Sequence, residues 1–441
     1  MTALSAKARQ ILTPLRIQMG IGFAAKGLTA AASFALNWLI AQRFGAAGVG
    51  LFGVAQTTAL LGSTLALMGL EYVTVRQVAK LLRLGRSGEA RRTLFAALRQ
   101  TAVTALLLGG GLFAFSEPFA RDALEHGEAG PFLAMMAFAI PIVALAKIVS
   151  AALRGSGHVL ASQSIDGPIG TGLTAIVLAA LIFAGEARAP LLPAILYVVF
   201  GLLATGIAWL ILLREVRRWA PASGPAPALV RMGVPILAIA MSQMFVDWFA
   251  LLVLTAQGDP AQAGQFRIAY QIVSVLNLLN VASEGILAPV IAQEHATGNK
   301  ARIAAMMART SALLVALASP LLLVCFVAPQ FILGLFGTEF TGAGTALQIL
   351  TAGQLVNLAL GPIGGVLVMT HNERWALAYG IVAAIMSAGL CLWLIPLYGL
   401  TGAALAVTAA VVFRRLAAAA IVRFVVGIEL WRWRAPVGER K

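Results

Sequence analysis

Long apolar runs separated by short polar connections dominate the chain. A helix needs about 20 mostly apolar residues to cross the hydrocarbon core of a membrane, and twelve runs approach or exceed that length. The pattern therefore predicts an all-α polytopic membrane protein with twelve transmembrane helices. The runs are Ile17–Gln42, Val49–Leu70, Leu98–Phe115, Phe132–Leu153, Val159–Ala184, Leu191–Leu213, Val230–Ala256, Ile268–Ala292, Ser311–Val327, Ala343–Met369, Trp375–Pro396 and Leu400–Val425.

The composition supports the same class. The 441 residues are 60% apolar and 11% charged, against about 45–50% and about 25% in soluble domains. A soluble fold of this length has too little interior to bury so much apolar surface, so that class is excluded. The net charge of +15 would elsewhere suggest a nucleic-acid partner. In a membrane protein, basic residues first indicate which connections stay in the cytoplasm.

The basic residues are distributed very unevenly. Most of the 32 lysines and arginines lie in the chain ends, in connections after even-numbered runs, or near the cytoplasmic end of a run, where we place Arg414 and Arg415. Only four lie in connections after odd-numbered runs: Arg43, Arg121, Arg188 and Arg267. The positive-inside rule then places both termini in the cytoplasm. The charge is explained by topology, and we expect no nucleic-acid partner.

The second half of the chain repeats features of the first. Matching segments occur at a nearly constant separation: Arg16 and Met19-Gly20 with Arg231-Met232-Gly233, and Ala41-Gln42 and Gly50-Leu51-Phe52 with Ala256-Gln257 and Gly264-Gln265-Phe266. A basic, proline-containing break lies between the halves. We expect two parallel six-helix repeats around a central cavity, an arrangement that secondary transporters use. The predicted parts are an N-terminal lobe (1–213), a cytoplasmic basic linker (214–231), a C-terminal lobe (232–427) and a cytoplasmic tail (428–441).

Five ionisable residues lie inside the apolar runs: Lys26, Lys147, Asp166, Asp247 and Glu284. Each costs about 2.5–3.5 kcal/mol on insertion scales, and such residues usually face a bundle interior or a water-filled cavity. For Lys147 and Asp166, near predicted cytoplasmic run ends, we favour a structural role, by snorkelling or by pairing near the surface. Lys26 lies deep in the first run.

Polar residues recur at helical spacing around the deep charges. Thr29, Ser33 and Asn37 follow Lys26 on one helix face, and Tyr270, Ser274, Asn277 and Glu284 form a similar stripe in the eighth run. In the seventh run, Gln243 and Asp247 are one turn apart. Such stripes either hold helices together or line a cavity, and the embedded charges favour a cavity. Candidate substrate-binding residues are therefore Lys26, Asn37, Arg267, Tyr270 and Asn277.

The sequence contains no recognisable catalytic or metal site. The four histidines are scattered, the two cysteines lie in apolar runs, and no Gly-x-x-x-x-Gly-Lys-Ser/Thr segment is present for ATP hydrolysis. We therefore expect neither an enzyme nor a resident cofactor. Transport would then be driven by an ion gradient, the membrane potential or the substrate's own gradient. Asp247 and Glu284 are candidate coupling sites for a proton or a sodium ion, because a carboxylate partly withdrawn from water can exchange either.

Three turn segments of the chain have recognisable patterns. They are Arg43-Phe44-Gly45 through Gly50-Leu51-Phe52, Leu335-Phe336-Gly337-Thr338-Glu339-Phe340, and Ile395-Pro396-Leu397-Tyr398-Gly399-Leu400-Thr401-Gly402-Ala403-Ala404. They resemble turns of bacterial polysaccharide flippases of the Wzx type, within the multidrug/oligosaccharidyl-lipid/polysaccharide exporter superfamily. The first resembles the turn between the first two spans of that family, the second resembles the turn before the tenth, and the third is the nearest match. The resemblance extends from Arg16 to Gly427.

The resemblance implies two six-helix lobes, alternating access and export of undecaprenyl-diphosphate-linked oligosaccharides across the bacterial inner membrane. Lys26, with Arg267 at the outer mouth, would hold the diphosphate, because a cation facing phosphate forms a strong charge-assisted pair. Membrane lipids, a polysaccharide polymerase and a chain-length regulator are the implied partners. Peptidoglycan-precursor flippases of the superfamily usually have fourteen spans, whereas this chain has twelve predicted runs.

Two alternatives remain open. A cation-coupled multidrug exporter of the same superfamily would need an acidic, aromatic cavity, and the deep Lys26 argues against one. The chain could also be a non-transporting membrane component of a polysaccharide assembly complex. A membrane-embedded glycosyltransferase ranks last, because the longest outer connection, about Ser116–Pro131, is too short to hold its catalytic groups.

Overall fold

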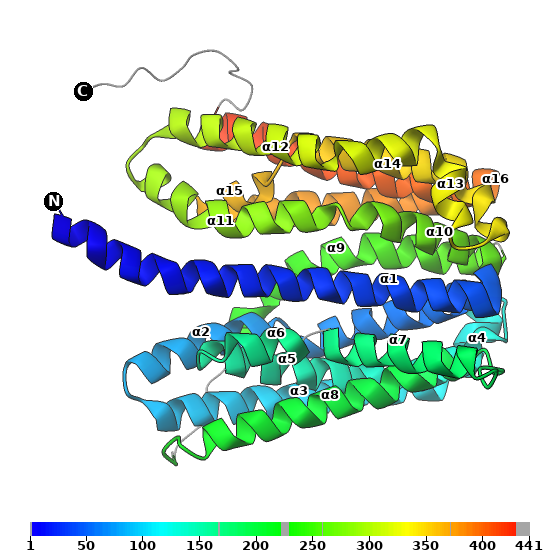
Figure 1. Ribbon diagram of the computed structural model, residues 1–441, viewed down its shortest axis with the longest axis horizontal. Helices are drawn as coiled ribbons and strands as arrows, with labels where there is room; N and C mark the ends of the chain where they lie inside the picture. Colours follow the sequence, from blue (N-terminus) through cyan, green and yellow to red (C-terminus); the bar gives the residue numbers. More distant parts are fainter. Residues whose placement is uncertain (1, 166–167, 222–228, 258, 371, 429–441) are drawn as a thin grey trace. The chain divides into compact units, whose positions relative to one another are not determined.

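A computed structural model describes residues 2–165, 168–221, 229–257, 259–370 and 372–428. Over these residues the chain is almost entirely helical and contains no strand (Figure 1). Seven helices are long and apolar enough to cross a membrane. The predicted all-α polytopic membrane fold is confirmed.

The helices belong to two compact units. Unit 1 comprises Met1–Met244 and Thr255–Gly264, and unit 2 comprises Phe245–Leu254 and Gln265–Lys441. The helices α9, Val230–Gln257, and α10, Pro260–Ser274, each contribute to both units. Part of the predicted basic linker and most of the predicted tail lie outside the described residues, and the lobe boundaries stay a prediction.

Unit 1 is built around helices that pack side by side along their lengths (Figure 1). In this unit α1 packs against α5 and α7, while α5 also packs against α2, α3 and α8. Its core includes Phe52, Leu94, Leu133 and Ile148, each less than 2% exposed. The helices are α1 Thr2–Leu67, α2 Leu70–Arg83, α3 Ser87–Pro118, α4 Ala129–Ala137, α5 Ala139–Gly155, α6 Val159–Ile165, α7 Pro168–Phe183 and α8 Leu192–Val216, with a π-helical turn at Phe119–Ala123.

Unit 2 has a similar helical build. Here α12 and α16 pack against α14, and α15 packs against α11 and α16. One core cluster includes Ile303, Met307, Ile363 and Val422. The remaining helices are α10 Pro260–Ser274, α11 Asn277–Ala296, α12 Lys300–Val327, α13 Pro329–Gly334, α14 Gly344–Ala359, α15 Ile363–Met369 and α16 Glu373–Ile421, with a 3-10 turn at Thr338–Ala343 and a π-helical turn at Val422–Val426.

Two of the long helices each contain two predicted runs. A non-helical residue divides each of them, Gly45 (φ 66°) in α1 and Gly399 (φ 52°) in α16. Positive φ is readily adopted by glycine and disfavoured for other residues, so these glycines set the points where the chain turns. Both belong to the turn segments that resemble the flippase family, which explains why those segments are recognisable.

Three predicted runs coincide with helices that are interrupted within the described residues. Phe132–Leu153 is divided between α4 and α5, Ile268–Ala292 between α10 and α11, and Ala343–Met369 between α14 and α15. Val159–Ala184 includes residues 166–167, which lie outside the described residues. The seven long apolar helices overlap the other predicted runs and Phe132–Leu153. Irregular backbone at membrane depth is tolerated where protein or a water-filled cavity satisfies its polar groups, so these interruptions are places to look for function.

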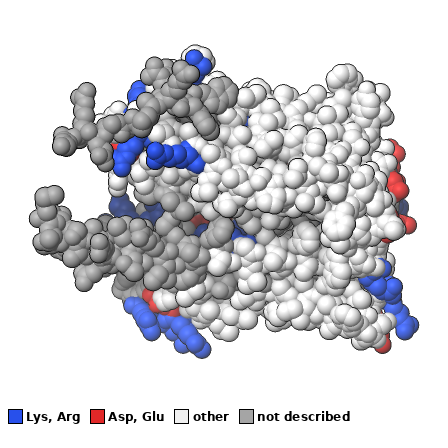
Figure 2. Space-filling view, turned by 45° about the horizontal axis from the view of Figure 1, so that its top comes forward, with Lys and Arg blue, Asp and Glu red and all other residues white. Residues whose placement is uncertain are grey.

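The surface has the character expected of a membrane-embedded chain. On the face shown in Figure 2, charged side chains gather mainly toward the two ends of the helices, and most of the area between them is uncharged. Large apolar side chains are highly exposed, among them Phe183 at 91% and Leu107 at 71%. Water would not stabilise so many exposed apolar side chains, whereas lipid tails would.

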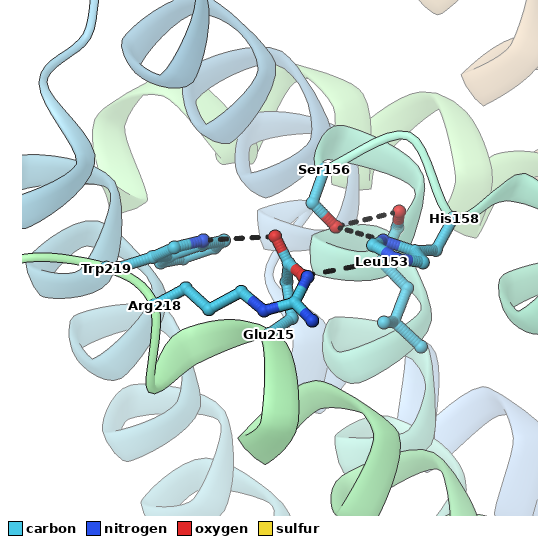
Figure 3. Close-up of polar contacts among 6 residues, drawn as sticks. All are labelled: Leu153, Ser156, His158, Glu215, Arg218 and Trp219. Carbon is cyan, nitrogen blue, oxygen red and sulfur yellow. Dashed lines mark hydrogen bonds and ion pairs between the residues drawn. The ribbon is translucent and has the colours of Figure 1, made fainter.

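At the end of unit 1 predicted to be cytoplasmic, one carboxylate holds several segments together (Figure 3). The Glu215 carboxylate of α8 accepts a hydrogen bond from Trp219 Nε1 at 3.4 Å. It lies 3.6 Å from Arg218 and 3.9 Å from the His158 ring in the turn between α5 and α6. Ser156 in the same turn bonds the Leu153 carbonyl at 3.1 Å. These contacts fix the turn against the end of α8.

Two glycines matched by the sequence duplication lie in direct backbone contact within unit 1. A Cβ added to Gly50 would lie 1.9 Å from the Pro260 carbonyl oxygen, and one added to Gly264 would lie 1.9 Å from the Ala46 carbonyl oxygen. Small residues let membrane helices approach this closely. The contact leaves no room for a side chain at Gly50 or at Gly264.

We expect Gly50→Ala to destabilise the protein. Its new methyl group would push two backbones apart, at a cost of about 1–3 kcal/mol for overpacking, which exceeds the gain of about 0.5–1 kcal/mol in helix propensity. Thermal unfolding of purified protein in detergent measures the effect. Gly110→Ala in α3 is the matched control, since nothing lies within 4 Å of its added Cβ. Equal unfolding midpoints for the two variants would contradict the contact.

Candidate functional site

A small cavity of about 70 Å³ lies inside unit 2. A water molecule needs about 10–15 Å³ of such volume, so the cavity has room for a few waters or an ion but not for an oligosaccharide. Residues of α10, α11, α14 and α16 line it: Tyr270, Val273, Ser274, Asn277, Leu350, Gly353, Gln354, Asn357, Val407, Thr408, Val411 and Arg414.

A carboxylate and an arginine meet beside this cavity. The Tyr270 hydroxyl of α10 donates a hydrogen bond to the Asp247 carboxylate of α9. Arg414 of α16 attracts the same carboxylate electrostatically. Because Tyr270 and Arg414 both line the cavity, Asp247 is one side chain away from a space that can admit water or an ion.

Side-chain amides form a network on the other side of the cavity. The Asn357 amide nitrogen of α14 donates to Gln354 Oε1 at 3.0 Å and to Asn277 Oδ1 of α11 at 3.4 Å. Its backbone carbonyl accepts from Asn280 Nδ2 at 3.4 Å. Asn357 therefore ties α11 to α14 at the cavity wall.

A second arginine completes the network. Arg415 of α16 donates through Nε to Asn357 Oδ1 and through a terminal nitrogen to the Gly361 carbonyl oxygen at 3.3 Å. Glu284 of α11 attracts the Arg415 guanidinium. A Cβ added to Gly365 in α15 would lie 3.6 Å from Glu284 Cγ, so the carboxylate side chain packs against that helix.

The placement of Arg414 and Arg415 corrects the sequence analysis. We counted both with the cytoplasmic end of the last run. In the structure Arg415 instead contacts Asn357, near the middle of the run Ala343–Met369, and Arg414 lines the cavity. Asn357 on α14 and the Gly361 carbonyl just after it hold the Arg415 guanidinium inside the unit. If Arg415 extended to the surface instead, these hydrogen bonds would be lost.

The structure brings four of the predicted site residues into one neighbourhood. Tyr270 and Asn277 line the cavity, Asp247 bonds Tyr270, and Glu284 reaches the cavity wall through Arg415 and Asn357. Arg267 of α10 is half-buried and is not among the residues that line the cavity.

The stripe in the first run lies in unit 1. Lys26 is exposed, whereas Asn37 is only 2% exposed and donates to the Ser33 carbonyl at 3.0 Å. Thr29 bonds the Ala25 carbonyl at 2.8 Å. Asn37 is thus engaged in packing within its helix, and its predicted contact with substrate stays a prediction.

The remaining charges in the runs add little to the site. Lys147 is half-buried in α5, and Asp166 lies outside the described residues. Sequence reasoning missed Gln354, Asn357, Arg414 and Arg415. The first two stand three residues apart in an apolar run, a spacing that places them on one helix face and could have marked them.

Comparison with known families places the chain. The model of the family described as polysaccharide biosynthesis protein matches residues 18–295. The chain belongs to the polysaccharide biosynthesis protein family. The sequence-based recognition is thereby confirmed at the level of the family. No curated protein sequence matches significantly.

Solved structures show how this polysaccharide biosynthesis family protein is folded. It superposes on an inward-facing multidrug resistance MATE family transporter of the MOP superfamily with a TM-score of 0.69 and 15% identity, covering 91% of this chain and 93% of that one. Against lipid II flippase MurJ in its inward closed conformation the TM-score is 0.67 with 14% identity, over 91% and 87% of the chains.

A third structure is a MOP superfamily transporter from Pyrococcus furiosus, described by the reverse polarity of its binding pocket. The TM-score is 0.57 at 16% identity, and 93% of each chain is covered. These likenesses establish that the chain shares the fold of those three proteins.

Removing the amide at the centre of the network is expected to destabilise the protein. Asn357→Leu leaves Arg415, Asn277 and Gln354 short of partners, and each unsatisfied buried polar group costs about 1–3 kcal/mol. Thermal unfolding in detergent should show a lower midpoint. Thr408→Val lines the same cavity but removes only a bond to the Ile349 carbonyl at 3.3 Å, so its loss should be clearly smaller. A greater loss for Thr408→Val would contradict the central place of Asn357.

Proposed function

We propose that this protein is a flippase that exports undecaprenyl-diphosphate-linked oligosaccharide repeat units across the bacterial inner membrane. The glycan would then enter exopolysaccharide or O-antigen assembly. Family membership is the observation that carries the proposal. The transporter fold and the paired charges inside unit 2 support it. In this proposal both termini lie in the cytoplasm, as the distribution of basic residues predicts.

Cations inside the membrane would bind the diphosphate. Lys26 and Arg267 are the residues that the sequence analysis selects, and Arg414 joins them because it lines the cavity. A phosphate oxygen and a guanidinium form a charge-assisted hydrogen bond that gains strength in a low dielectric. Asp247 already attracts Arg414. A substrate phosphate and the Asp247 carboxylate would therefore compete for the same cation.

That competition supplies a route to coupling. When Asp247 takes up a proton or a sodium ion, its attraction for Arg414 falls and the guanidinium becomes available to a phosphate. Release of the ion restores the pair and favours release of the substrate. Glu284 would act in the same way on Arg415. Because ion and substrate would move outward together in this scheme, export would draw its energy from the membrane potential, which favours outward movement of the anionic diphosphate, or from the substrate's own gradient.

Loss of the deep charges should abolish export. We expect Lys26→Ala, Asp247→Asn and Glu284→Gln each to reduce glycan export at least tenfold at normal protein level, because each removes a charge that binds substrate or a coupling ion. Surface polysaccharide in a host that lacks its own flippase is the measurement. Asp259→Asn is the control, since this exposed carboxylate only caps the start of α10. Normal export by all three variants would refute the residue assignments.

One observation favours a second candidate, a cation-coupled multidrug exporter. Phe245, Trp248 and Phe249 cluster on α9, the helix that also carries Asp247, with ring centroids 5.1–6.2 Å apart. Aromatic rings can bind an organic cation through their faces. Arg414 opposes this function, because it would repel such a ligand.

A drug-susceptibility panel separates the two functions. Under the flippase proposal, expression in a drug-sensitive host leaves the inhibitory concentrations of cationic dyes and antibiotics within about twofold of the empty-vector control. The reason is that Arg414 disfavours cations at the cavity. Resistance that rises several-fold and disappears in Asp247→Asn would establish the exporter instead. A non-transporting component of an assembly complex would fail both this test and the export test.

A further inference from the structure

Arg415 connects the cavity wall to a break in the tenth predicted run. The break is the segment Leu360–Pro362 between the end of α14 and the start of α15. The guanidinium of Arg415 bonds Asn357 Oδ1 on one side of it and the Gly361 carbonyl oxygen within it, the latter at 3.3 Å. One side chain of α16 thus holds both the amide at the cavity and the backbone of the break.

Local backbone bonds also hold the break, from Leu360 N to the Val356 carbonyl at 3.1 Å, from Gly361 N to the Leu358 carbonyl at 3.0 Å and from Gly365 N to the Pro362 carbonyl at 3.2 Å. Gly361 has φ 62°, and Pro362 has no N–H to donate. The Gly361 carbonyl also accepts a local bond from Ile363 N at 2.8 Å. A Cβ on Gly361 would lie 2.4 Å from Ser311 Oγ, so α12 packs tightly on the outer side. Arg415 supplies a side-chain hydrogen bond to this segment from another helix.

The charges around Arg415 are opposed. Glu284 of α11 attracts the Arg415 guanidinium, while Arg414, its neighbour on α16, repels it. The Tyr379 hydroxyl is the third titratable group that acts on Arg415. From α14 it meets the neutral amide of Asn357. Glu284 also packs against Gly364 and Gly365, just beyond the break. The carboxylate therefore touches the segment that follows the break and attracts the arginine that holds it.

We propose that Arg415 is a positioning residue that links the charge on Glu284 to the conformation of the break. With Glu284 ionised, the guanidinium is held between the carboxylate, Asn357 and Gly361. When a proton or a sodium ion neutralises Glu284, the attraction is lost and the repulsion from Arg414 remains. The guanidinium then leaves Gly361, the break loosens, and Asn357 is free to turn at the cavity wall. The inference rests on the proposed function only where it makes Glu284 an ion-coupling site.

Hydrogen–deuterium exchange of the purified full-length protein in lipid nanodiscs tests this link without measuring transport. At pH 7.5 we expect Arg415→Gln and Glu284→Gln each to speed exchange of the Gly361 and Ile363–Val366 amides at least fivefold. The double variant should be no faster than the faster single variant. Arg302→Gln is the control, since it removes an exposed arginine of the same unit that pairs with Glu294 at 3.1 Å, and it should leave these amides unchanged.

The pH response separates positioning from a merely structural role. Lowering the pH until Glu284 is protonated should speed exchange of the wild-type break, after correction for the intrinsic rate, and Glu284→Gln should show no such change. Arg415→Lys keeps the charge but cannot bond Asn357 and Gly361 together, so it should exchange at an intermediate rate and retain the pH response. This variant carries the test if Arg415→Gln does not fold.

Each outcome decides the inference separately from the proposed function. Unchanged exchange in Arg415→Gln overturns the inference, whether or not export is lost. Faster exchange in Arg415→Gln with wild-type exchange in Glu284→Gln overturns the link between them. A loosened break in both variants together with normal export supports the inference and counts against a coupling role for Glu284.

Discussion

A charged side chain inside a membrane must be matched by a partner, and unit 2 is organised around that requirement. Arg414 and Arg415 lie near the middle of an apolar run, where hydrocarbon would penalise them heavily. Asp247 attracts the first and Glu284 the second. Because each carboxylate stands on a different helix from its arginine, these attractions favour the packing of α9 and α11 near α16.

The irregular backbone of unit 2 lies beside these polar groups. The interruption between α10 and α11 is flanked by Ser274 and Asn277, which line the cavity. The break after α14 follows Asn357 and receives a bond from Arg415. Free backbone carbonyls in hydrocarbon are unfavourable, so a membrane helix can be interrupted where protein or water satisfies them. The polar side chains that hold the arginines inside the unit therefore lie next to the interruptions whose backbone groups need polar partners.

Much of the fold could be predicted because its determinants are local. Apolar runs mark helices directly, and Gly45 and Gly399 mark turns because few other residues adopt their backbone angles. The family was recognisable from those turns for the same reason. Arg414 and Arg415 were misplaced because a long arginine side chain in an apolar run can either extend toward the surface or stay inside the unit. The choice depends on Asn357, a residue of another helix, which hydropathy along one helix cannot reveal. Asn37 illustrates the converse: helical spacing placed it on a polar face, but the depth of its burial depends on neighbouring helices.

The contact between Gly50 and Gly264 has a consequence for the history of the chain. If the halves arose by duplication of a six-helix ancestor, these glycines descend from a single residue. In a two-fold dimer of that ancestor the residue would have packed against its own copy, as residues near the axis of a symmetric interface do. Any larger side chain there would have collided with itself, so one mutation would have acted twice. Fusion of the genes removed that symmetry constraint, since a mutation at one glycine then no longer changed the other. The backbone contact nevertheless still excludes a side chain on either one.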